Sequence, residues 1–485
     1  MQDLAKVWEA EALLDPTDQE VNRKIIQATQ DNMTFKGKRY WVGMPWIDSG
    51  VDPNFRQVLY RFNKLITHLN QEDLFDRYDA EIQQLKDNNH IEIVRQDDRT
   101  KGCYLAHREV LKEGSATTKI RLVFDGSGHS SGNKSLNECM SKGVDMNPLM
   151  LQVLALFRMG RYGIIADLKQ AFLQIRMHER DRDYFKFLWI ENGRLVTYRF
   201  TSVPFGATAS PYLLNVVKQS HFDRHREEFP IVNVLEKAMY VDDVIIAVNS
   251  KAEIENLHEQ TTALFAKCSM GVHKWRCSEV ETDQALAGND TPTTVKVLGT
   301  KWDVHADTLG VRFEIIASES VTKRIVLRQI GSLYDPLGIA GPVVCAFKML
   351  MQQLTIDQLG WYAPIKEETN LFRKLQGKLS LTEQICIPRC IGINAKDCVL
   401  ATFCDASTKA YGAVVYALNL KTMDRVLVAS RSRLNPVKQM TVPRAELMSA
   451  VIGAELTSRV KKWTGIESYP CCHRCAPMVS CANGK

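Results

Sequence analysis

An apolar run at residues 239–248, MYVDDVIIAV, contains two adjacent aspartates, and this pattern constrains the fold more than any other part of the chain. β-Branched and apolar residues around a short polar turn predict a β-hairpin whose strands are buried and whose turn presents Asp242 and Asp243. Adjacent carboxylates in an apolar hairpin are costly unless a cation neutralises them. The pattern therefore indicates either a divalent metal site or an Asp-rich β-turn without a chemical role.

A third aspartate favours the metal site. Asp167 ends another apolar run, YGIIAD at 162–167, which predicts a strand. A strand that ends in an aspartate can lie beside the tip of the hairpin and add a third carboxylate. Such oxygen ligands suit Mg²⁺, which requires octahedral geometry and shares its coordination shell with substrate phosphates.

The segments around these aspartates follow a defined order of predicted elements. Residues 196–201 alternate as a strand, and 207–223 form a predicted helix that tolerates Pro211 near its start. After the hairpin comes an amphipathic helix, and residues 295–299 return as a strand. The apolar face of that helix carries Ile254, Leu257, Leu264, Phe265 and Cys268. This order is typical of the palm of a nucleic-acid polymerase.

Short motifs along the chain then carry a resemblance to a known family. They are YWVGMP at 40–45, KIRLVFD at 119–125, KSLNE at 134–138, IADLKQAF at 165–172, VPFG at 203–206, YVDD at 240–243 and YDPLG at 334–338. Together they resemble the reverse transcriptase of the BEL/Pao group of long-terminal-repeat retrotransposons, nearly continuously from about residue 1 to 463. The resemblance implies an RNA-directed DNA polymerase with the α+β right-hand fold of fingers, palm and thumb.

The resemblance also implies the chemistry of the three aspartates. Asp167, Asp242 and Asp243 match the catalytic, metal-binding triad of the family. Two Mg²⁺ ions about 3.5–4 Å apart, for which Mn²⁺ can substitute, would activate a primer 3′-hydroxyl and stabilise the leaving pyrophosphate. Lys274 lies where a lysine could act as the general acid that protonates pyrophosphate. The implied partners are an RNA or DNA template with its primer, deoxynucleoside triphosphates and the remainder of a retrotransposon polyprotein.

Five further residues match nucleotide-binding positions of the family. Arg121 matches an arginine of the fingers that grips the triphosphate, a role for which its forked guanidinium is better suited than a lysine, and Lys119 is a looser match nearby. Phe172 matches an aromatic gate that would exclude a 2′-hydroxyl. Phe205 and Gly206 match a loop that packs on the nascent base pair. The alternatives are solvated charges for the basic residues and a core aromatic for Phe172.

The segment after residue 396 resembles the start of a ribonuclease H domain. Residues 399–405, 410–416 and 426–430 predict three antiparallel strands, and a helix begins near Thr441. Asp405 and Glu446 match the first two metal ligands of that family, whereas the chain contains no aspartate after Asp424. We therefore expect an incomplete RNase H-like α/β domain with a vestigial site and an open sheet edge.

Two other functions remain open beside the polymerase. A decayed or domesticated remnant could bind nucleic acid without catalysis. This region of the family is also sometimes described as a Pao-type retrotransposon peptidase, but Asp405-Ala-Ser lacks the glycine of an aspartic-protease turn, and no second copy is visible. The glycine-rich segment 126–135 resembles a phosphate loop, but Asn133 separates its last glycine from Lys134.

These assignments predict five regions. Residues 1–100 form a helical lead-in and the start of the fingers, and residues 101–305 form the fingers and palm. Residues 306–395 form the thumb and connection, 396–463 the truncated RNase H-like domain, and 464–485 a divergent cysteine-rich tail. Within that tail, Cys472 and Cys475 have metal-ligand spacing.

Composition and charge limit the partners and the cellular location that we expect for the protein. The chain has 485 residues, 45% of them hydrophobic, and a net charge of only +6, so positive charge for nucleic acid must be concentrated locally. No run approaches 18 apolar residues, and the N-terminus lacks the basic region of a signal peptide. We expect no membrane association or secretion, reduced thiols for the thirteen cysteines, and a cytoplasmic, virus-like-particle location with possible nuclear access.

Overall fold

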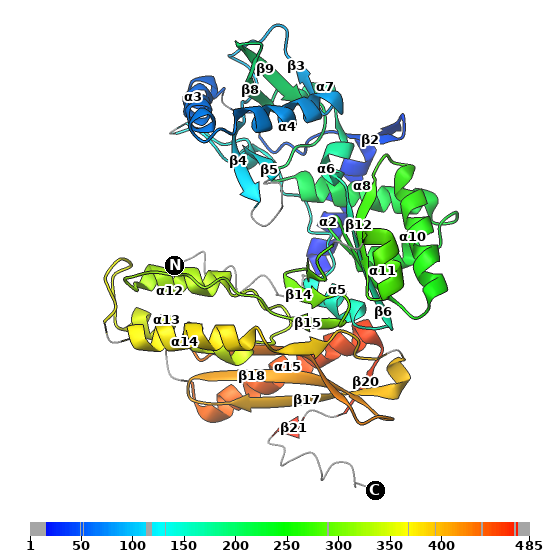
Figure 1. Ribbon diagram of the computed structural model, residues 1–485, viewed down its shortest axis with the longest axis vertical. Helices are drawn as coiled ribbons and strands as arrows, with labels where there is room; N and C mark the ends of the chain where they lie inside the picture. The colour runs from blue at the N-terminus through cyan, green and yellow to red at the C-terminus, as the bar shows by residue number, and fades with distance from the viewer. Residues whose placement is uncertain are drawn as a thin grey trace. The chain divides into compact units, whose positions relative to one another are not determined.

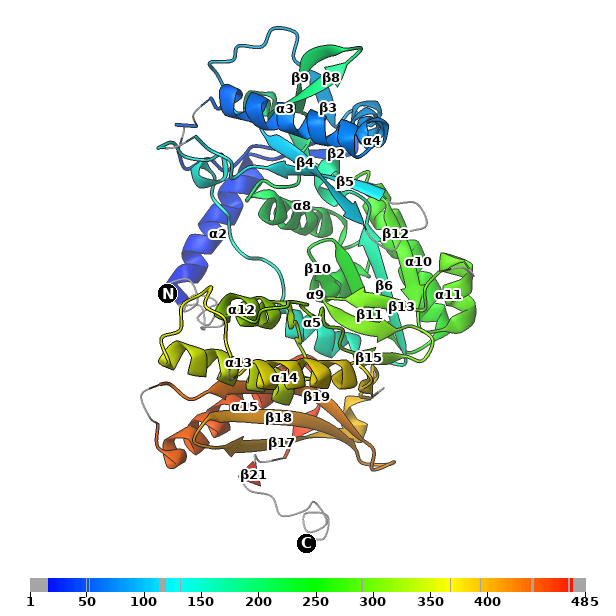
Figure 2. The same ribbon diagram turned by 60° about the vertical axis from the view of Figure 1, so that its left-hand side comes forward.

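The computed structural model describes residues 16–473 except 49, 52, 113–118, 131, 289–290, 367, 393, 438–439 and 470–471. The chain divides into two compact units (Figures 1 and 2). Unit 1 contains Met1–Asn147, Leu168–Glu236 and Gln260–Val272, and unit 2 contains Pro148–Asp167, Lys237–Glu259 and His273–Lys485. The predicted N-terminal segment before residue 16 and Cys475 of the tail lie outside the described residues. None of the described helices is both long and apolar enough to cross a membrane.

Unit 1 combines three small sheets with helices. The sheets have the orders β1(Thr34–Lys36)-β2(Arg39–Val42)-β7(Arg176–Met177), β3(Ile91–Ile93)-β9(Arg194–Phe200)-β8(Lys186–Glu191) and β4(Ala106–Lys112)-β5(Lys119–Asp125). The helices are α2(Pro16–Asp31), α3(Phe55–Gln71), α4(Phe75–Asp87), η1(Asn137–Cys139), α6(Ala171–Gln174), α7(Glu179–Arg182) and α8(Ser210–His225). Helix α9(Val232–Ala238) passes from unit 1 into unit 2, and α10(Lys251–Ala266) passes from unit 2 into unit 1.

His107 lies at the centre of the aromatic core of unit 1. Its Nε2 donates to the Leu188 carbonyl at 2.9 Å, and its Nδ1 accepts from the Tyr78 hydroxyl at 2.5 Å. The rings of Phe124, Phe187 and Trp189 lie 5.4, 5.5 and 6.1 Å from the imidazole. Burial among these rings lowers the pKa of His107 to about 4. The imidazole is therefore neutral at physiological pH and hydrogen-bonded at both nitrogens.

Unit 2 begins with a four-stranded sheet in the order β10(Met239–Tyr240)-β11(Asp243–Val248)-β6(Tyr162–Leu168)-β12(Val272–Cys277). The helices α5(Met150–Phe157) and α11(Val280–Ala287) accompany it, and α5 contacts both β10 and β11. The central strand β6 buries Gly163, Ile164, Ala166 and Leu168. Near-continuous burial of this kind explains why its sequence is almost wholly apolar before Asp167.

A second sheet of unit 2 has the order β13(Thr294–Val297)-β14(Thr300–Asp303)-β15(Thr308–Gly310)-β16(Cys386–Pro388). Three helices lie in the chain between its last two strands: α12(Lys323–Ser332), α13(Gly341–Ile356) and α14(Thr369–Thr382). Asp335 fixes the turn before α13, because its carboxylate accepts the backbone N–H groups of Ile339 and Ala340 at 2.9 and 2.6 Å. The YDPLG motif is thus a turn that its own aspartate holds directly before α13.

The C-terminal sheet of unit 2 has the order β19(Arg425–Leu434)-β18(Ala410–Asn419)-β17(Cys398–Ala406)-β20(Glu467–Ser468), with β21(Cys472–His473) also paired to β17. A short helix η2(Ala395–Asp397) precedes β17, and the long helix α15(Val442–Thr464) packs on β17 and β18 (Figure 1). Gly453 permits this approach, since a Cβ there would lie 2.3 Å from the Cys404 sulfur. Strands β20 and β21 run parallel to β17.

The strands of unit 2 differ from the sequence predictions at the sheet edge, in the C-terminal tail and in the thumb segment. The three strands and the helix predicted after residue 396 are present. The open sheet edge that we expected is not, because β20 and β21 pair with the edge of β17. They come from residues that we had assigned to a divergent tail. The predicted thumb and connection segment also contributes β15 and β16 to a sheet that begins with β13. Pairing across long stretches of sequence leaves no local signal in the residues themselves.

Protonation of His107 should destabilise unit 1 at acid pH. Its pKa in the folded state lies below the ordinary value of about 6.5, so its contribution to stability is present above pH 6.5 and is lost as the pH falls toward 4. We expect about 2 kcal/mol to be lost between pH 7 and pH 5. Urea unfolding followed by tryptophan fluorescence measures this loss. In His107→Gln, whose amide can keep both hydrogen bonds without titrating, the loss should shrink by that amount, and an unchanged pH dependence would contradict the assignment.

Candidate active site

The strand pairing of unit 2 brings two of the predicted catalytic carboxylates together. In the antiparallel ladder of β6 and β11, Asp167 lies directly opposite Asp243. Residues opposite one another in such a ladder project from the same face of the sheet, with Cβ atoms about 4.5–5.5 Å apart. Like charges at these positions destabilise the pairing, so the sheet alone gives no reason for this arrangement.

The third carboxylate lies in the hairpin turn. Tyr240 on β10 pairs with Asp243 on β11, which leaves Val241 and Asp242 as the two turn residues. Val241 has a positive φ of 54°, a conformation that is rare for a β-branched residue. Strained backbone of this kind is concentrated at functional sites. The predicted hairpin is therefore confirmed, whereas its turn contains Val241 and Asp242 and the second aspartate, Asp243, is the first residue of β11.

The surroundings of the three aspartates set their charge. Burial, followed by Asp242 and then Asp167, raises the pKa of Asp243 to about 6, and Lys274 opposes this shift. The Lys274 ammonium forms an ion pair with Oδ2 of Asp167, and His273 Nε2 lies 3.3 Å from the same oxygen. Lys274 was proposed from the sequence as a general acid, whereas His273 was not recognised. Both come from β12, which follows β6 in the sheet order.

The fit of a divalent cation depends on these carboxylates. Within the described ranges, no group of three or more His, Cys, Asp and Glu side chains stands in an arrangement that would hold a metal ion. The Asp167 carboxylate is instead paired with the cation of Lys274. The donor chemistry nevertheless fits, because Asp167 and Asp243 are opposed across β6 and β11 next to Asp242, and a bound cation would offset the burial and the neighbouring carboxylates that raise the pKa of Asp243.

The predicted nucleotide gate lies in unit 1. Phe172 is half-buried on the short helix α6, and its ring meets that of Phe205 edge-on at 5.2 Å and 90°. Phe205 is 43% exposed, which leaves ring surface free for a ligand. Gly206 follows with a φ of +95°, and a Cβ there would lie 2.2 Å from the Phe124 carbonyl oxygen. Glycine is therefore required at position 206 by a close backbone approach to β5.

Asn137 holds this loop against the end of β5. Its Nδ2 donates to the Gly206 carbonyl at 3.0 Å, and its Oδ1 accepts the Thr208 N–H at 2.9 Å. Its own N–H donates to the Gly126 carbonyl at 3.0 Å. The KSLNE motif contributed to the family resemblance, but this role of its asparagine was not predicted. Asn137 is thus a positioning residue for the Phe205 loop.

The two basic residues of the fingers lie on β5. Arg121 is exposed and lies opposite Val110, and it has no carboxylate partner among the described residues. Lys119 begins the strand, opposite Lys112. An exposed guanidinium on a strand can offer its forked donors to a phosphate, and phosphate binding stays a prediction for both residues.

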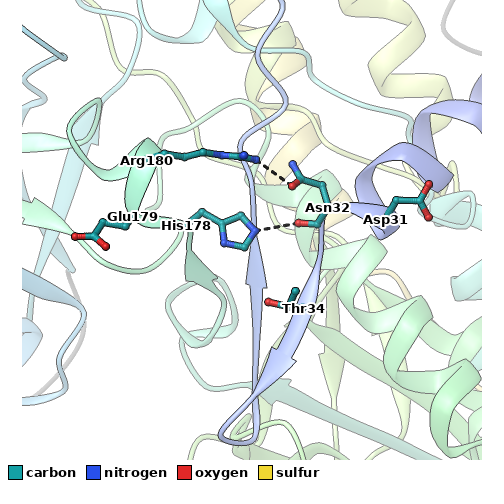
Figure 3. Close-up of a pocket in the computed structure, with 6 residues that line it drawn as sticks. All are labelled: Asp31, Asn32, Thr34, His178, Glu179 and Arg180. Carbon is teal, nitrogen blue, oxygen red and sulfur yellow. Dashed lines mark hydrogen bonds between the residues drawn. The ribbon is translucent and has the colours of Figure 1, made fainter.

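The pocket drawn in Figure 3 belongs to another part of unit 1. It has a volume of about 410 Å³ and lies between the end of α2 and the start of α7. His178 Nε2 donates to the Asn32 carbonyl and Arg180 Nη2 donates to the Asn32 Oδ1, both at 3.0 Å. These polar groups satisfy one another across the pocket, so we interpret it as a contact that fastens α2 and not as a ligand site.

The predicted ribonuclease site lies in the C-terminal sheet. Cys404 and Ala406 pack in a small apolar cluster with Ala445 of α15, so alternation along β17 directs the exposed Asp405 to the opposite face. Glu446 is half-buried in the first turns of α15. The structure therefore separates the faces on which these two residues lie, and shows no further carboxylate with them among the described residues.

Comparison with known proteins identifies two domains in the chain. A model described as reverse transcriptase (RNA-dependent DNA polymerase) matches residues 124–302, and one described as Pao retrotransposon-like RNaseH-like domain matches residues 322–473. The chain carries a reverse transcriptase domain followed by a Pao-type RNase H-like domain. These matches confirm the resemblance to the BEL/Pao group. Reverse transcriptases as a family use divalent metals. The RNase H-like match begins within the segment that we had assigned to the thumb and connection.

Solved structures support the same fold for this reverse transcriptase region. A foamy viral protease-reverse transcriptase in complex with an RNA/DNA hybrid is 14% identical, with a TM-score of 0.55 over 98% of this chain and 58% of that one. A second foamy viral structure, bound to double-stranded DNA, is also 14% identical, with a TM-score of 0.53 over 100% of this chain and 76% of that one. The chain thus spans little more than half of the first of these proteins. A comparison with curated protein sequences found no match.

We expect the RNase H-like domain to lack nuclease activity. Hydrolysis by two metal ions needs several converging carboxylates, whereas Asp405 and Glu446 lie on different faces and Glu455 is nine residues from Glu446 on the same helix, roughly 13 Å away. An RNA/DNA hybrid should stay intact with the purified chain in Mn²⁺. Release of RNA fragments by the wild type, lost in Asp405→Asn, would show that a nuclease site does assemble.

Proposed function

We propose that the chain is an RNA-directed DNA polymerase of a retrotransposon, which adds deoxynucleotides to the 3′-hydroxyl of a primer. The observation that carries this proposal is the in-register pair of Asp167 and Asp243 beside Asp242 in a strained turn. A sheet gains nothing from opposed carboxylates, so their presence points to a cation-dependent reaction. The reverse transcriptase match over residues 124–302 supports the same reaction.

The three aspartates would hold two Mg²⁺ ions, for which Mn²⁺ can substitute. Bound metal ions of this kind lower the pKa of an attacking hydroxyl and stabilise charge on the leaving pyrophosphate. The other residues of the chain orient the substrates. Phe172 and Phe205 form an aromatic corner for the sugar and base, and Arg121 offers a forked donor for the triphosphate.

Lys274 is the candidate proton donor of the reaction. Its ammonium carries a proton at Nζ next to Asp167, and its side chain is 66% exposed. An exposed lysine beside the metal-binding carboxylates can pass a proton to an oxygen of the departing pyrophosphate, as a general acid must. While it pairs with Asp167, it also supplies the positive charge that this carboxylate needs.

The expected partners follow from this reaction. The foamy viral proteins of similar fold are bound to an RNA/DNA hybrid and to double-stranded DNA. We propose an RNA or DNA template with a primer, and deoxynucleoside triphosphates, as the substrates of this chain. The remainder of a retrotransposon polyprotein and a cytoplasmic, virus-like particle are the proposed context.

Replacement of a metal-binding aspartate should abolish DNA synthesis. We expect Asp167→Asn or Asp242→Asn to slow primer extension on an RNA template at least 10³-fold, roughly 4 kcal/mol of barrier, because one cation ligand is lost. Binding of the primer–template should be nearly unchanged, because it depends mainly on phosphate contacts. Extension gels in Mg²⁺ and Mn²⁺ and a filter-binding assay measure both properties.

The outcome separates two functions. Extension by Asp242→Asn at the wild-type rate would contradict the metal assignment. A wild-type chain that binds the primer–template but never extends it would instead identify a decayed nucleic-acid-binding remnant.

Replacement of Phe172 should relax the choice of sugar. Phe172 lies five residues after Asp167, and its edge-on contact with Phe205 fixes the ring in one orientation. We expect Phe172→Val to open space for a 2′-hydroxyl and to raise ribonucleotide incorporation relative to deoxynucleotide incorporation at least 10-fold, since about 1.4 kcal/mol of steric exclusion is a factor of ten. Single-nucleotide extension with each substrate gives the ratio. An unchanged ratio would mean that Phe172 is only a core aromatic.

A further inference from the structure

Two buried arginines connect the catalytic sheet of unit 2 to the RNase H-like sheet. Arg158 follows α5 and Arg389 follows β16, and both side chains are completely buried. They are 231 residues apart in the chain, yet Arg158 Nε donates to the Arg389 carbonyl at 3.0 Å. The Arg158 carbonyl in turn accepts the Ile391 N–H at 2.9 Å. The two segments are therefore hydrogen-bonded in both directions.

Arg389 binds the turn that leads into β6. Its Nη1 donates to the Phe157 carbonyl at 2.6 Å, and its Nη2 donates to the carbonyls of Gly160 and Arg161 at 3.1 and 2.8 Å. Its side chain also fills the space over Gly163, where a Cβ would lie 2.7 Å from its Nε. Gly163 lies on β6 four residues before Asp167, roughly 13 Å along the strand.

Arg158 extends from the same turn into the RNase H-like sheet. Its Nη1 donates to the Val428 carbonyl on β19 at 2.9 Å, and its Nη2 donates to the Pro388 carbonyl at 3.1 Å. Among the described residues it has no carboxylate partner, whereas Arg389 pairs with Asp307 at 2.6 Å. A buried guanidinium with only carbonyl partners is costly, so its retention indicates a requirement for a fixed geometry.

The apolar core supports the same connection. One cluster of buried side chains includes Leu154 and Phe157 of α5 together with Leu456 and Val460 of α15. Helices α5 and α15 are in direct contact. The turn before α13 is also tied to β19, since Ser430 donates through its N–H to the Leu337 carbonyl at 2.9 Å and through its Oγ to the Gly338 carbonyl at 2.8 Å.

We propose that the RNase H-like domain acts as a structural support of the polymerase palm, and that Arg158 and Arg389 are positioning residues that hold β6 and its Asp167 in register with β11. The domain would thus contribute to DNA synthesis without any nuclease chemistry. The part of this inference that concerns catalysis rests on the proposed polymerase function, whereas the part that concerns β6 does not.

Arg158→Met in the full chain tests the connection, because methionine keeps the aliphatic length and removes all three donated hydrogen bonds. We expect amide hydrogen exchange in β6 to accelerate at least 10-fold, and kcat for primer extension to fall at least 10-fold. The KM for the deoxynucleotide and the affinity for primer–template should stay within twofold. Arg158→Lys, which keeps the charge and part of the donor capacity, should recover part of both losses.

Ile452→Ala is the matched control. Ile452 is buried on α15 in the small cluster with Cys404 and Ala445, and not in the core that α15 shares with α5. It should lower the thermal stability of the RNase H-like domain while leaving β6 exchange and kcat near those of the wild type. Both variants are compared at a temperature at which circular dichroism shows each to be folded.

The two measurements separate the possible failures. If Arg158→Met changes β6 exchange no more than Ile452→Ala does at equal loss of stability, the support role is wrong. If the wild type shows no extension, the polymerase proposal fails, and the exchange comparison still decides whether the RNase H-like domain holds β6.

Discussion

The ion pair between the completely buried Arg389 and the partly exposed Asp307 is the interaction on which the arrangement of unit 2 depends. One guanidinium neutralises a carboxylate of the β14–β15 turn, binds three carbonyls before β6 and fills the space that Gly163 leaves. An arginine can do this because its planar fork presents five donors in a fixed geometry, which a lysine could not match. Arg158 adds the bond to the Val428 carbonyl of β19, so the two arginine side chains join the turn before β6, the second sheet and the RNase H-like sheet.

This support is needed because the catalytic hairpin contains opposed carboxylates and a strained turn, both of which destabilise it. Asp167 and Asp243 face one another across a ladder, and burial, followed by Asp242 and then Asp167, raises the pKa of Asp243 to about 6. Val241 adds backbone strain in the turn. Strands destabilised by charge repulsion and backbone strain need a rigid surrounding core. The apolar residues of β6 and β11 provide this core together with α5 and α15.

The sequence predicted the parts of this molecule that have local signals. The apolar flanks of Asp242 gave the hairpin, and the run that ends at Asp167 gave the neighbouring strand. The three strands and the helix after residue 396 were also correct, because alternation and helical periodicity are read within a few residues. Lys119 and Arg121 lie on β5 and Phe172 lies on α6, neither of which was predicted from the sequence, and the roles of these residues remain predictions.

The contacts that the sequence did not reveal all join distant segments. Asn137 binds Gly206, His273 reaches Asp167, and Arg158 reaches Val428, 270 residues away. The strands β20 and β21 were missed because their only signal is the partner β17. A single arginine or asparagine looks the same in sequence whether it is solvated or buried, so only the folded chain distinguishes them.

Unit 2 is built from segments that are far apart in the sequence, so its core is completed late in translation. During translation, Arg158 is synthesised 270 residues before Val428, its partner on β19. At ribosomal rates of about 5–20 residues per second, this gap lasts roughly 15–50 s. From the synthesis of Asp243 until that of Val428, the nascent palm has its three aspartates but not the core that holds them. A chain released early, by a stop codon or a frameshift, would then carry every polymerase motif and still have no assembled palm.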